Sequence, residues 1–406
     1  MRPRLIRTVV PAIVLLGGVI ASQAGVAGAA TPRVNTLWVA PVATTSKTAA
    51  CQTAAYHEIN PAIAAASSGD TVMVCAGTYT GFTTITTGVA QQPTITTGAE
   101  IDKSIRLIGQ PGAIIDATGL DNGVTFFVAT EATVRGFAIT GAMGEGILAL
   151  LSSHLTIADN LVKNNDTGSS TSPWFECDNA GSTIPNDCGE GIHLMSSTYS
   201  KVLDDTSEFN SGGILLSDDL GPNHGNTVSG NLVVDNESDC GITVVGHLGT
   251  AVSKSGVPTP AKGGTYENTI SDNIVISNGT TGEGGGILLA SGASGGGSYD
   301  NTVTGNEIAG NGLSGITIHQ HFPLSDVSGD VFTNNWIGTN DLTGDPGTGD
   351  SVTTGVLVDN GGTGKTISVT VEDNTIAWDV YGIYDDAPGI TRAGNVFLHV
   401  LVHFKK

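Results

Sequence analysis

The motif NTVTGN (301–306) followed by SGITIH (314–319) decides the fold, because the chain repeats it. Each copy holds an Asn-containing turn, then a Gly-Ile step, then alternating apolar residues. Two earlier copies have the same form: NTVSGN (226–231) with CGITVV (240–245), and NTISDN (268–273) with GGILLA (285–290). One copy therefore corresponds to one turn of a repeating structure.

The isoleucines of the Gly-Ile steps give the period of the repeat. They are Ile192, Ile214, Ile242, Ile287 and Ile316, which lie 22, 28, 45 and 29 residues apart. A base unit in the twenties with occasional insertions is typical of a β-solenoid. Its short strands alternate at period two, so one set of side chains faces inward and the other outward. Asn and Gly at the corners tolerate positive φ, and stacked Asn side chains can hydrogen-bond neighbouring coils.

Composition excludes two classes of protein. Lys and Arg total 16 against 38 Asp and Glu, for a formal net charge of −22, whereas binding to a phosphate backbone requires clustered Lys and Arg. We therefore expect no nucleic-acid partner. Apolar residues make up 39% of the chain and charged residues only 13%, which separates it from disordered acidic proteins and predicts a packed core.

The N-terminus has the pattern of a secretory signal. Three arginines within residues 1–8 precede an apolar stretch at 9–20, and small residues follow at 27–29. The apolar stretch is shorter than the roughly 20 residues that span a bilayer, and no second run of that length follows. We predict a signal peptide over residues 1–30, a secreted (extracellular or cell-surface) protein, and no membrane partner after signal removal.

Residues 31–406 are expected to form a single β-helix domain. An N-terminal cap and the first coils occupy 31–130, and the repeat body occupies 131–398. The segment AAYHEINPAIAAA (54–66) is the clearest helical pattern in the chain. We expect it to cap the apolar end of the solenoid, as terminal repeats must be shielded from water. We expect the protein to be a monomer.

Five cysteines in an exported chain suggest two disulfides and one remaining thiol. The most local pairs are Cys51 with Cys75 and Cys177 with Cys188. Cys240 would then stay free inside a strand-like run, where a buried Cys acts as a small apolar residue. The chain has no C-x-x-C spacing, which excludes zinc-ribbon and thioredoxin-like sites.

The chain resembles a known group of proteins. The segments GDTVMVCAGTYTG (69–81) and KSIRLIGQPGAIIDATG (103–119), with the N-x-[IV]-x-x-N and GI-x-[LV] units, resemble right-handed parallel β-helix proteins of the pectin-lyase-like superfamily, including NosD-type repeat proteins. The resemblance covers about residues 36–398. It implies an all-β, right-handed parallel β-helix with a short N-terminal helical cap. It does not specify an activity, because that superfamily holds lyases, hydrolases, epimerases, adhesins and proteins of no known activity.

Alternation along the strands identifies one outward face as the candidate site. If the isoleucine of each Gly-Ile step points inward, Asp219 and His247 point outward on neighbouring coils, which lie about 4.8 Å apart in a parallel sheet. The candidate catalytic residues are Asp218, Asp219, His247 and His319. The candidate substrate-binding residues are His193, His224, His321 and Asp326.

The pair Asp218-Asp219 with Gly246-His247-x-Gly249 resembles part of the polygalacturonase pattern. That resemblance implies that one aspartate protonates the leaving oxygen, the other activates water and His247 orients them. The sequence departs from the pattern, because Leu248 interrupts the Gly-His-Gly motif and the family's Asn-Thr-Asp and Arg-x-Lys motifs are absent. A lyase-like or epimerase-like site with His247 or His319 as base is the other interpretation.

Charge argues against pectate-lyase chemistry, which resembles Arg-assisted proton abstraction beside a Ca²⁺-bound uronate. No Arg lies between Arg135 and Arg392, and an acidic surface repels polyuronates unless Ca²⁺ bridges the carboxylates. Neutral or amino sugars suit this surface better. Ca²⁺ is the cofactor considered for the acidic turn at 341–350, although that turn lacks the spacing of a calcium loop and a solvated turn explains it more simply.

His319-Gln320-His321 allows a metal site. Two His at alternate positions of a strand project on the same side, and Asp326 or Asp219 could complete the ligand set. Two surface His at the end of a strand explain so short a motif more simply.

The sequence therefore predicts a secreted carbohydrate-active β-helix protein that cleaves or modifies an extended polysaccharide as a hydrolase, a lyase or an epimerase. The alternative is a non-catalytic cell-surface or glycan-binding protein. In that case the β-helix is a rigid rod and the insertions carry recognition.

Overall fold

The computed structural model describes residues 34–406 apart from several short segments. The segments outside the description are 45, 89–92, 169–188, 249–250, 253–257, 260–262, 282–283, 321, 323, 345–351 and 362–365. Residues Val34–Lys406 form one compact unit. The predicted signal peptide, the predicted Cys177–Cys188 pair and His321 lie outside the described residues. No helix of the described residues is long and apolar enough to cross a membrane.

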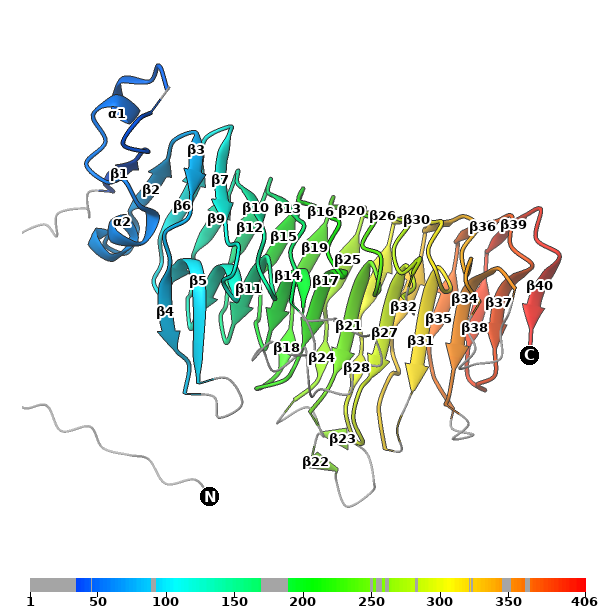
Figure 1. Cartoon of the computed structure of the whole chain (residues 1–406). Helices are drawn as coiled ribbons and strands as arrows, with labels where there is room; N and C mark the ends of the chain where they lie inside the picture. Colours follow the sequence, from blue (N-terminus) through cyan, green and yellow to red (C-terminus); the bar gives the residue numbers. More distant parts are fainter. Residues whose placement is uncertain are drawn as a thin grey trace, which may run out of the picture. The chain divides into compact units, whose positions relative to one another are not determined.

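The chain folds into a right-handed parallel β-helix, as predicted. Each coil contributes one short strand to each of three sheets, here called sheets A, B and C, and strands of successive coils lie side by side (Figure 1). The strands within these sheets pair in parallel, except that β4 and β5 of sheet C are antiparallel. In three coils, the strand of sheet C is followed along the chain by a strand of a smaller sheet. A two-stranded hairpin lies within one of the insertions.

The strands follow in stacking order. Sheet A contains β1 (Thr36–Val39), β2 (Thr71–Val74), β6 (Arg106–Gly109), β9 (Thr133–Arg135), β12 (Thr156–Ala158), β15 (Lys201–Leu203), β19 (Thr227–Ser229), β25 (Thr269–Ser271), β29 (Thr302–Thr304), β32 (Val331–Thr333), β35 (Thr370–Glu372) and β38 (Thr391–Ala393). Sheet B contains β3 (Gly77–Tyr79), β7 (Ala113–Asp116), β10 (Ala138–Thr140), β13 (Leu161–Lys163), β16 (Thr206–Glu208), β20 (Leu232–Val234), β26 (Ile274–Ile276), β30 (Glu307–Ala309), β33 (Trp336–Ile337), β36 (Thr375–Ala377) and β39 (Val396–Leu398). Sheet C contains β4 (Thr83–Thr86), β5 (Thr94–Ile101), β8 (Asn122–Phe127), β11 (Ile147–Leu150), β14 (Glu190–Met195), β17 (Gly212–Ser217), β21 (Ile242–Gly246), β27 (Ile287–Ser291), β31 (Ile316–Gln320), β34 (Thr354–Asp359), β37 (Tyr381–Asp385) and β40 (Val402–Lys405). The small sheet contains β18 (Asn223–His224), β24 (Thr265–Tyr266) and β28 (Ser298–Tyr299), and the hairpin contains β22 (Ala251–Val252) and β23 (Pro258–Thr259).

Two short helices precede the first complete coils. α1 covers Ala49–Gln52 and α2 covers Ile59–Ala65. α2 buries three apolar side chains and contacts β1, β2 and β5, so it covers the apolar end of the interior as expected. The helix is shorter than the predicted 54–66, because Tyr56 bridges to Val39 of β1 and its backbone is committed to strand-like hydrogen bonds there.

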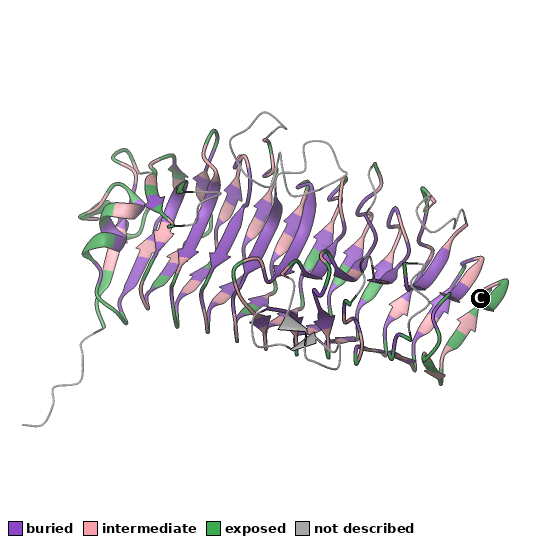
Figure 2. Ribbon diagram, turned by 90° about the horizontal axis from the view of Figure 1, so that it is seen from below, coloured by how far each residue is buried: buried purple, intermediate pink, exposed green. Residues whose placement is uncertain are grey.

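Apolar side chains fill the interior of the coils. The isoleucines of the Gly-Ile steps are completely buried and lie in register on successive strands of sheet C; they are Ile192, Ile214, Ile242, Ile287 and Ile316. Buried residues run along the strands from coil to coil (Figure 2). The predicted inward orientation of these isoleucines is therefore confirmed, and it fixes which residues face outward.

Three ladders of polar side chains join the corners of successive coils. At a typical rung the Asn Oδ1 accepts the backbone N–H of the rung residue one coil earlier, and the Asn Nδ2 donates to the Oδ1 of the next rung; Asn340 differs, because its Nδ2 donates to the backbone carbonyls of Ile308 and Gly338. Asn231 shows both contacts, with Asp205 N and with Asn273 Oδ1, each at 2.9 Å. The ladder between sheets A and B contains Asn160, Asp205, Asn231, Asn273, Asn306, Asn335, Asn374 and Asn395; that between B and C contains Asn165, Asn210, Asn236, Asn278, Asn311, Asn340 and Asp379; that between C and A contains Asn226, Asn268, Asn301 and Asp330.

Three rungs carry Asp where the others carry Asn: Asp205, Asp330 and Asp379. Each Oδ1 accepts a backbone N–H as an Asn would, but the buried Oδ2 takes the place of the donating amide and has no hydrogen-bond partner. Burial raises the pKa of Asp205 to about 7 and that of Asp379 to about 8, and it raises the pKa of Asp330 well above its ordinary value. Each of these Asp rungs therefore suits the folded state when its carboxyl group is protonated, and ionisation of the carboxyl destabilises the fold.

We predict that Asp205→Asn stabilises the protein at pH 8 and that its advantage shrinks in acid. The pKa of Asp205 is higher in the folded than in the unfolded state, so wild-type stability is fully present below about pH 4 and is lost as pH rises through about 7. A shift of that size costs up to about 4 kcal/mol once the carboxyl ionises. Urea unfolding of both proteins between pH 4 and pH 9 measures the difference.

Asp204→Asn is the matched control for this prediction. Asp204 is the exposed neighbour of the rung residue and tolerates the same substitution at its positive φ. It should leave the pH dependence of unfolding unchanged. A pH-independent difference between Asp205→Asn and wild type would contradict the ionisation argument.

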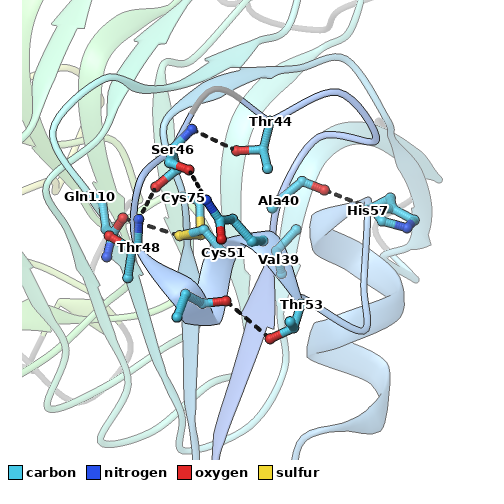
Figure 3. The surroundings of a disulfide bond; sticks show 12 residues. Val39, Ala40, Thr44, Ser46, Thr48, Cys51, Thr53, His57, Cys75 and Gln110 are labelled. Atoms are coloured by element: carbon cyan, nitrogen blue, oxygen red, sulfur yellow. Dashed lines mark hydrogen bonds between the residues drawn. A yellow bond between two sulfur atoms is a disulfide. The ribbon is translucent and has the colours of Figure 1, made fainter.

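Cys51 of α1 and Cys75, directly after β2, form the predicted disulfide, with Cα atoms 6.0 Å apart (Figure 3). The bond ties α1 to the first coils. Cys240 is a free, buried thiol, as expected. Burial and the nearby Asp239 carboxyl raise the pKa of the Cys240 thiol well above its ordinary value, so it acts as a small apolar side chain.

Candidate functional site

The outward side chains of sheet C form columns, as the sequence predicted. In the first column the strand register aligns His193, Leu215, Thr243, Leu288 and Thr317. In the second it aligns Met195, Ser217, Val245, Ala290, His319 and Asp359. Residues on neighbouring coils in one column are therefore close in space although they lie far apart in sequence.

Asp219 and His247 meet at the carboxyl ends of β17 and β21. The Asp219 Oδ1 atom lies 2.7 Å from His247 Nδ1, and the His247 side chain is 42% exposed against 21% for Asp219. Burial by itself would raise the pKa of Asp219, but the charge and hydrogen bond of His247, with help from His193 and Ser217, outweigh it and hold the pKa below its usual value. An ionised carboxylate therefore fixes the orientation of an accessible imidazole.

Asp218 has a different role from its neighbour. Its side chain is completely buried, and Oδ1 accepts the backbone N–H groups of His247 at 2.6 Å and Leu248 at 3.0 Å. Oδ2 accepts the backbone N–H of Gly264. Burial raises the pKa of Asp218 against the opposing effect of these three hydrogen bonds. Asp218 thus holds the backbone that carries His247. Of the three side chains, that of His247 is the most exposed, and Asp219 fixes its orientation.

A chain of polar contacts continues from Asp219 into the protein. The Ser217 hydroxyl contacts Asp219 Oδ2 and lies 2.7 Å from His193 Nε2. The His193 Nδ1 atom lies 2.7 Å from Glu145 Oε1. Since the hydroxyl has one proton, which it donates to the Asp219 carboxylate, His193 Nε2 is the donor to Ser217. The order Glu-His-Ser matches that of a hydrolytic triad, but Ser217 is completely buried, so it cannot reach a substrate as a nucleophile.

Glu145 and His193 also belong to the group of described residues whose side chains could hold a metal ion. Their ligand atoms and one of Glu190 lie within 4.8 Å of one another, and all three residues are buried. Glu145 Oε2 additionally accepts the Glu190 backbone N–H at 2.8 Å. His193, which the sequence placed among substrate-binding residues, therefore lies beneath the surface.

His319 lies on a later coil and has its own carboxylate. Its Nε2 atom is 2.6 Å from Asp359 Oδ2, and the His319 side chain is 22% exposed. Two His–Asp pairs therefore lie on one face: Asp219 with His247, both predicted from the sequence, and the predicted His319 with Asp359. Asp359 was missed because the Gly-Ile step of its coil reads Gly355-Val; extending the second column through that weaker copy identifies it.

The other predicted binding residues lie beside this face. His224 stands on β18, with its ring stacked on Tyr266 at a centroid distance of 4.7 Å; Tyr266 in turn stacks on Tyr299 at 5.1 Å. Asp326 forms an isolated bridge with Gly297, and its Oδ1 accepts the Ser328 backbone N–H at 3.0 Å. The structure thus brings Asp218, Asp219 and His247 together. His224 lies on the small sheet that follows sheet C, and Asp326 lies beside that small sheet.

A family model matches the chain over residues 64–250 and 175–312, and its description is periplasmic copper-binding protein (NosD). The chain belongs to the NosD family. Solved parallel β-helices are similar to this NosD protein: the A-module of an Azotobacter vinelandii mannuronan C-5 epimerase (15% identity, TM-score 0.52, 85% of this chain and 91% of that one) and a pectate lyase (17%, 0.50, 90% and 79%). A tailspike protein of an E. coli bacteriophage shares 14% identity at TM-score 0.53, over 84% of this chain and 57% of its own. These likenesses establish the fold. A search of curated protein sequences gave no match.

The donor atoms of the buried group formed by Glu145, Glu190 and His193 restrict which metal ions it could hold. Cu⁺ prefers sulfur ligands, and the Glu145, Glu190 and His193 group offers two carboxylates and one imidazole. Such a set suits Cu²⁺, Zn²⁺ or Mn²⁺. Among the described cysteines, Cys240 has a free thiol, which is buried and accepts the Gly285 backbone N–H at 3.2 Å.

We predict that Gly292→Ala displaces the His247 imidazole. A Cβ at residue 292 would lie 2.4 Å from His247 Cδ2, so the side chain of His247 must move away and lose its 2.7 Å contact with Asp219. Imidazole ¹⁵N signals of histidine-labelled protein report the loss. Gly221→Ala is the matched control, because a Cβ there meets nothing within 4 Å. Unchanged His247 signals in Gly292→Ala would refute the ring placement.

Proposed function

We propose that this NosD-family protein is a carbohydrate-active β-helix protein that binds an extended polysaccharide along the outward face of sheet C and modifies it by proton transfer at His247. One observation carries the proposal: the exposed His247 imidazole is fixed by an ionised, largely buried Asp219. A carboxylate on Nδ1 leaves Nε2 as the basic atom, directed away from Asp219. This is the arrangement of a general base.

Proton abstraction fits this geometry better than hydrolysis by two carboxylates. Hydrolysis of a glycosidic bond requires two carboxyl groups that flank the bond, one of them free to donate a proton. Asp218 is buried and bound to three backbone N–H groups, and Asp219 is bound to His247 and Ser217. We therefore favour a lyase-type or epimerase-type reaction, in which an imidazole removes a proton from carbon.

Removal of a proton from carbon calls for a uronate chain as the substrate, because the carboxyl group beside that carbon stabilises the negative charge that is left. The protein carries a formal net charge of −22, and the carboxyl group of Asp219 at the site is ionised. A polyanionic glycan would be repelled by such a surface in the absence of a bridging cation.

We further propose that the protein works outside the cytoplasm. The Cys51–Cys75 disulfide supports this, because disulfides persist in oxidising compartments. The leader-like pattern of residues 1–30 supports export, and the polysaccharides of cell surfaces and of the surroundings are found there.

The test is an incubation with a panel of neutral, amino-sugar and uronate polysaccharides. We expect unsaturated or epimerised product from the wild type. We expect turnover to fall at least about 100-fold in His247→Gln, because a general base contributes a factor of that order. Asp219→Asn should abolish turnover as well and leave the fold intact.

His154→Gln is the matched control for this test, since His154 is exposed and stands apart from sheet C. It should retain wild-type turnover. Full activity in Asp219→Asn would reject the site assignment. Binding without turnover across the panel would reject the enzyme and favour a glycan-binding protein.

A second candidate function is the binding of a divalent transition ion, favoured by the buried Glu145, Glu190 and His193 group and by the description of the family. These three side chains would hold the ion, and it would supply a buried positive charge. Ser217 would then fix His193 through Nε2 and leave Nδ1 for the ion.

Titration calorimetry with Cu²⁺, Zn²⁺ and Mn²⁺ tests this candidate. We expect one ion per chain in the wild type, and at least about tenfold weaker binding in Glu190→Gln, because a metal site loses one of three ligands. Glu237→Gln, at an exposed position, is the control. Equal affinity in Glu190→Gln and wild type would reject the site.

A further inference from the structure

The outward columns of sheet B become apolar over the later coils of the stack. The strands of this sheet are labelled along the upper edge of the stack in Figure 1. Leu232 and Ile274 lie side by side in one column and are 38% and 41% exposed. With the apolar residues around them they form a surface that we call the apolar strip: Leu232, Val234, Ile274, Ile276, Ala309, Trp336 and Trp378.

The indole of Trp336 lies along the surface of sheet B instead of standing out from it. A Cβ at residue 338 would lie 2.8 Å from Cη2 and 2.9 Å from Cζ3 of Trp336. The end of the ring therefore occupies the space above Gly338, at the position where the preceding coils carry Ile276 and Ala309. Glycine at residue 338 admits the ring, and Trp336 stays partly exposed.

Trp378 lies beside Trp336 on the next coil and is 55% exposed. The two ring centroids are 6.0 Å apart, with an angle of 64° between the ring planes. Trp378 directly precedes a rung of the ladder between sheets B and C and has a φ of 62°. Other coils carry Asn164, Asp235 and Gly310 at that corner, and such residues tolerate positive φ. A half-exposed tryptophan there combines backbone strain with apolar surface in water, and a bound ligand would remove the second cost.

The strip is too small for a stable protein partner. Four strand steps separate β20 from β36, so the strip is about 19 Å long, and its two columns lie about 7 Å apart. Its area is well below the roughly 800 Å² that each partner of a stable complex buries. An added β-strand is excluded as well, because the backbone groups of these strands are already paired with the neighbouring strands.

Charge excludes an anionic lipid surface and restricts the ligand to a neutral one. Among the described residues of the two columns between β20 and β36, Glu307 is the one charged side chain, and it is exposed. Anionic membranes are bound through clusters of Lys and Arg. A neutral ligand with an apolar face meets neither repulsion from Glu307 nor a need for cations.

We propose that the apolar strip binds a straight, neutral glucan chain of the cellulose type, with Trp336 and Trp378 as the rings on which its sugars stack. The hydroxyls of a β-linked glucose ring are equatorial, so both faces of the ring carry C–H groups that pack on aromatic side chains. A straight chain also follows a strip that runs along the stack of coils. The strip lies on sheet B and His247 on sheet C, so this inference goes beyond the proposed function and does not depend on it.

Titration calorimetry with cellohexaose, maltohexaose and an oligogalacturonate of the same length tests the strip. We expect cellohexaose to bind most tightly, because maltohexaose is curved and the uronate is repelled by Glu307. Trp378→Asn should weaken cellohexaose binding about tenfold, since it removes one stacked ring. Asn suits the positive φ of residue 378, so this variant should keep the fold.

Phe209→Asn is the matched control. Phe209 is an aromatic residue at the same corner of an earlier coil, is 48% exposed and lies beside Glu208 instead of the strip. It should keep wild-type affinity for cellohexaose. Gly338→Ala should weaken binding with both tryptophans still present, because the added Cβ displaces the Trp336 ring.

Fluorotryptophan labelling locates the ligand. The ¹⁹F signals of Trp336 and Trp378, assigned through Trp→Phe variants, should shift as cellohexaose is added. The signal of Trp38 in β1 should stay in place. Unmoved signals of both ring residues, wild-type affinity in Trp378→Asn, tightest binding of either other probe, or no binding of cellohexaose would overturn the proposal.

Two further measurements separate the glucan from other occupants and from the proposed function. A dimer that Trp378→Asn converts to a monomer in sedimentation, or binding to anionic vesicles that the same variant abolishes, would assign the strip to another partner and overturn the proposal. His247→Gln should bind cellohexaose as the wild type does. The glucan site therefore stands or falls separately from the reaction at His247.

Discussion

Capture of backbone N–H groups by Asn side chains at the corners is the interaction on which the rest of the structure depends. Every coil turns sharply, and each turn would leave buried N–H groups without a partner if no side chain reached them. The Oδ1 of Asn273, for example, accepts the Asn231 N–H at 3.0 Å, and Nδ2 of Asn273 passes the contact on to Asn306. Because each rung must face the rung before it, the ladders fix the register of the coils that they join, from Asn160 to Asn395.

Many aspartates of this protein are buried. The hydrogen-bond donors around each of these carboxyl groups therefore decide whether the group is ionised. Asp219 meets an imidazole and a hydroxyl and stays charged. Asp218 meets three backbone N–H groups, which oppose the effect of burial, and its pKa is still raised. Asp205 meets the backbone and amide N–H of Asn160 through Oδ1 alone, and its pKa rises to about 7. The same side chain thus serves as a charged orienting group, a backbone anchor or a proton-holding rung.

The fold and one pair of the site could be predicted from the sequence, because both depend on periodicity. Regular Gly-Ile steps fix which residues face outward, and that was sufficient to bring Asp219 and His247 together. Periodicity could not show whether an outward-facing side chain is covered by other parts of the chain. His193 faces outward and is nevertheless completely buried. Periodicity also could not separate the roles of Asp218 and Asp219, because those depend on backbone N–H groups supplied by residues as distant as Gly264.

The ladders also explain why the candidate site lies on sheet C. Five residues separate Asn226 from Asn231, and five more lead to Asn236, so the strands of sheets A and B are confined between closely spaced rungs. The return from Asn236 to the next rung at Asn268 takes 32 residues and passes through sheet C. In that coil, only the segment that passes through sheet C can accept an insertion. A change of length in either five-residue segment would break the register of a ladder. Variable loops and special side chains therefore gather around the one face whose length the ladders leave free, and that is where a ligand site can form without loss of the fold.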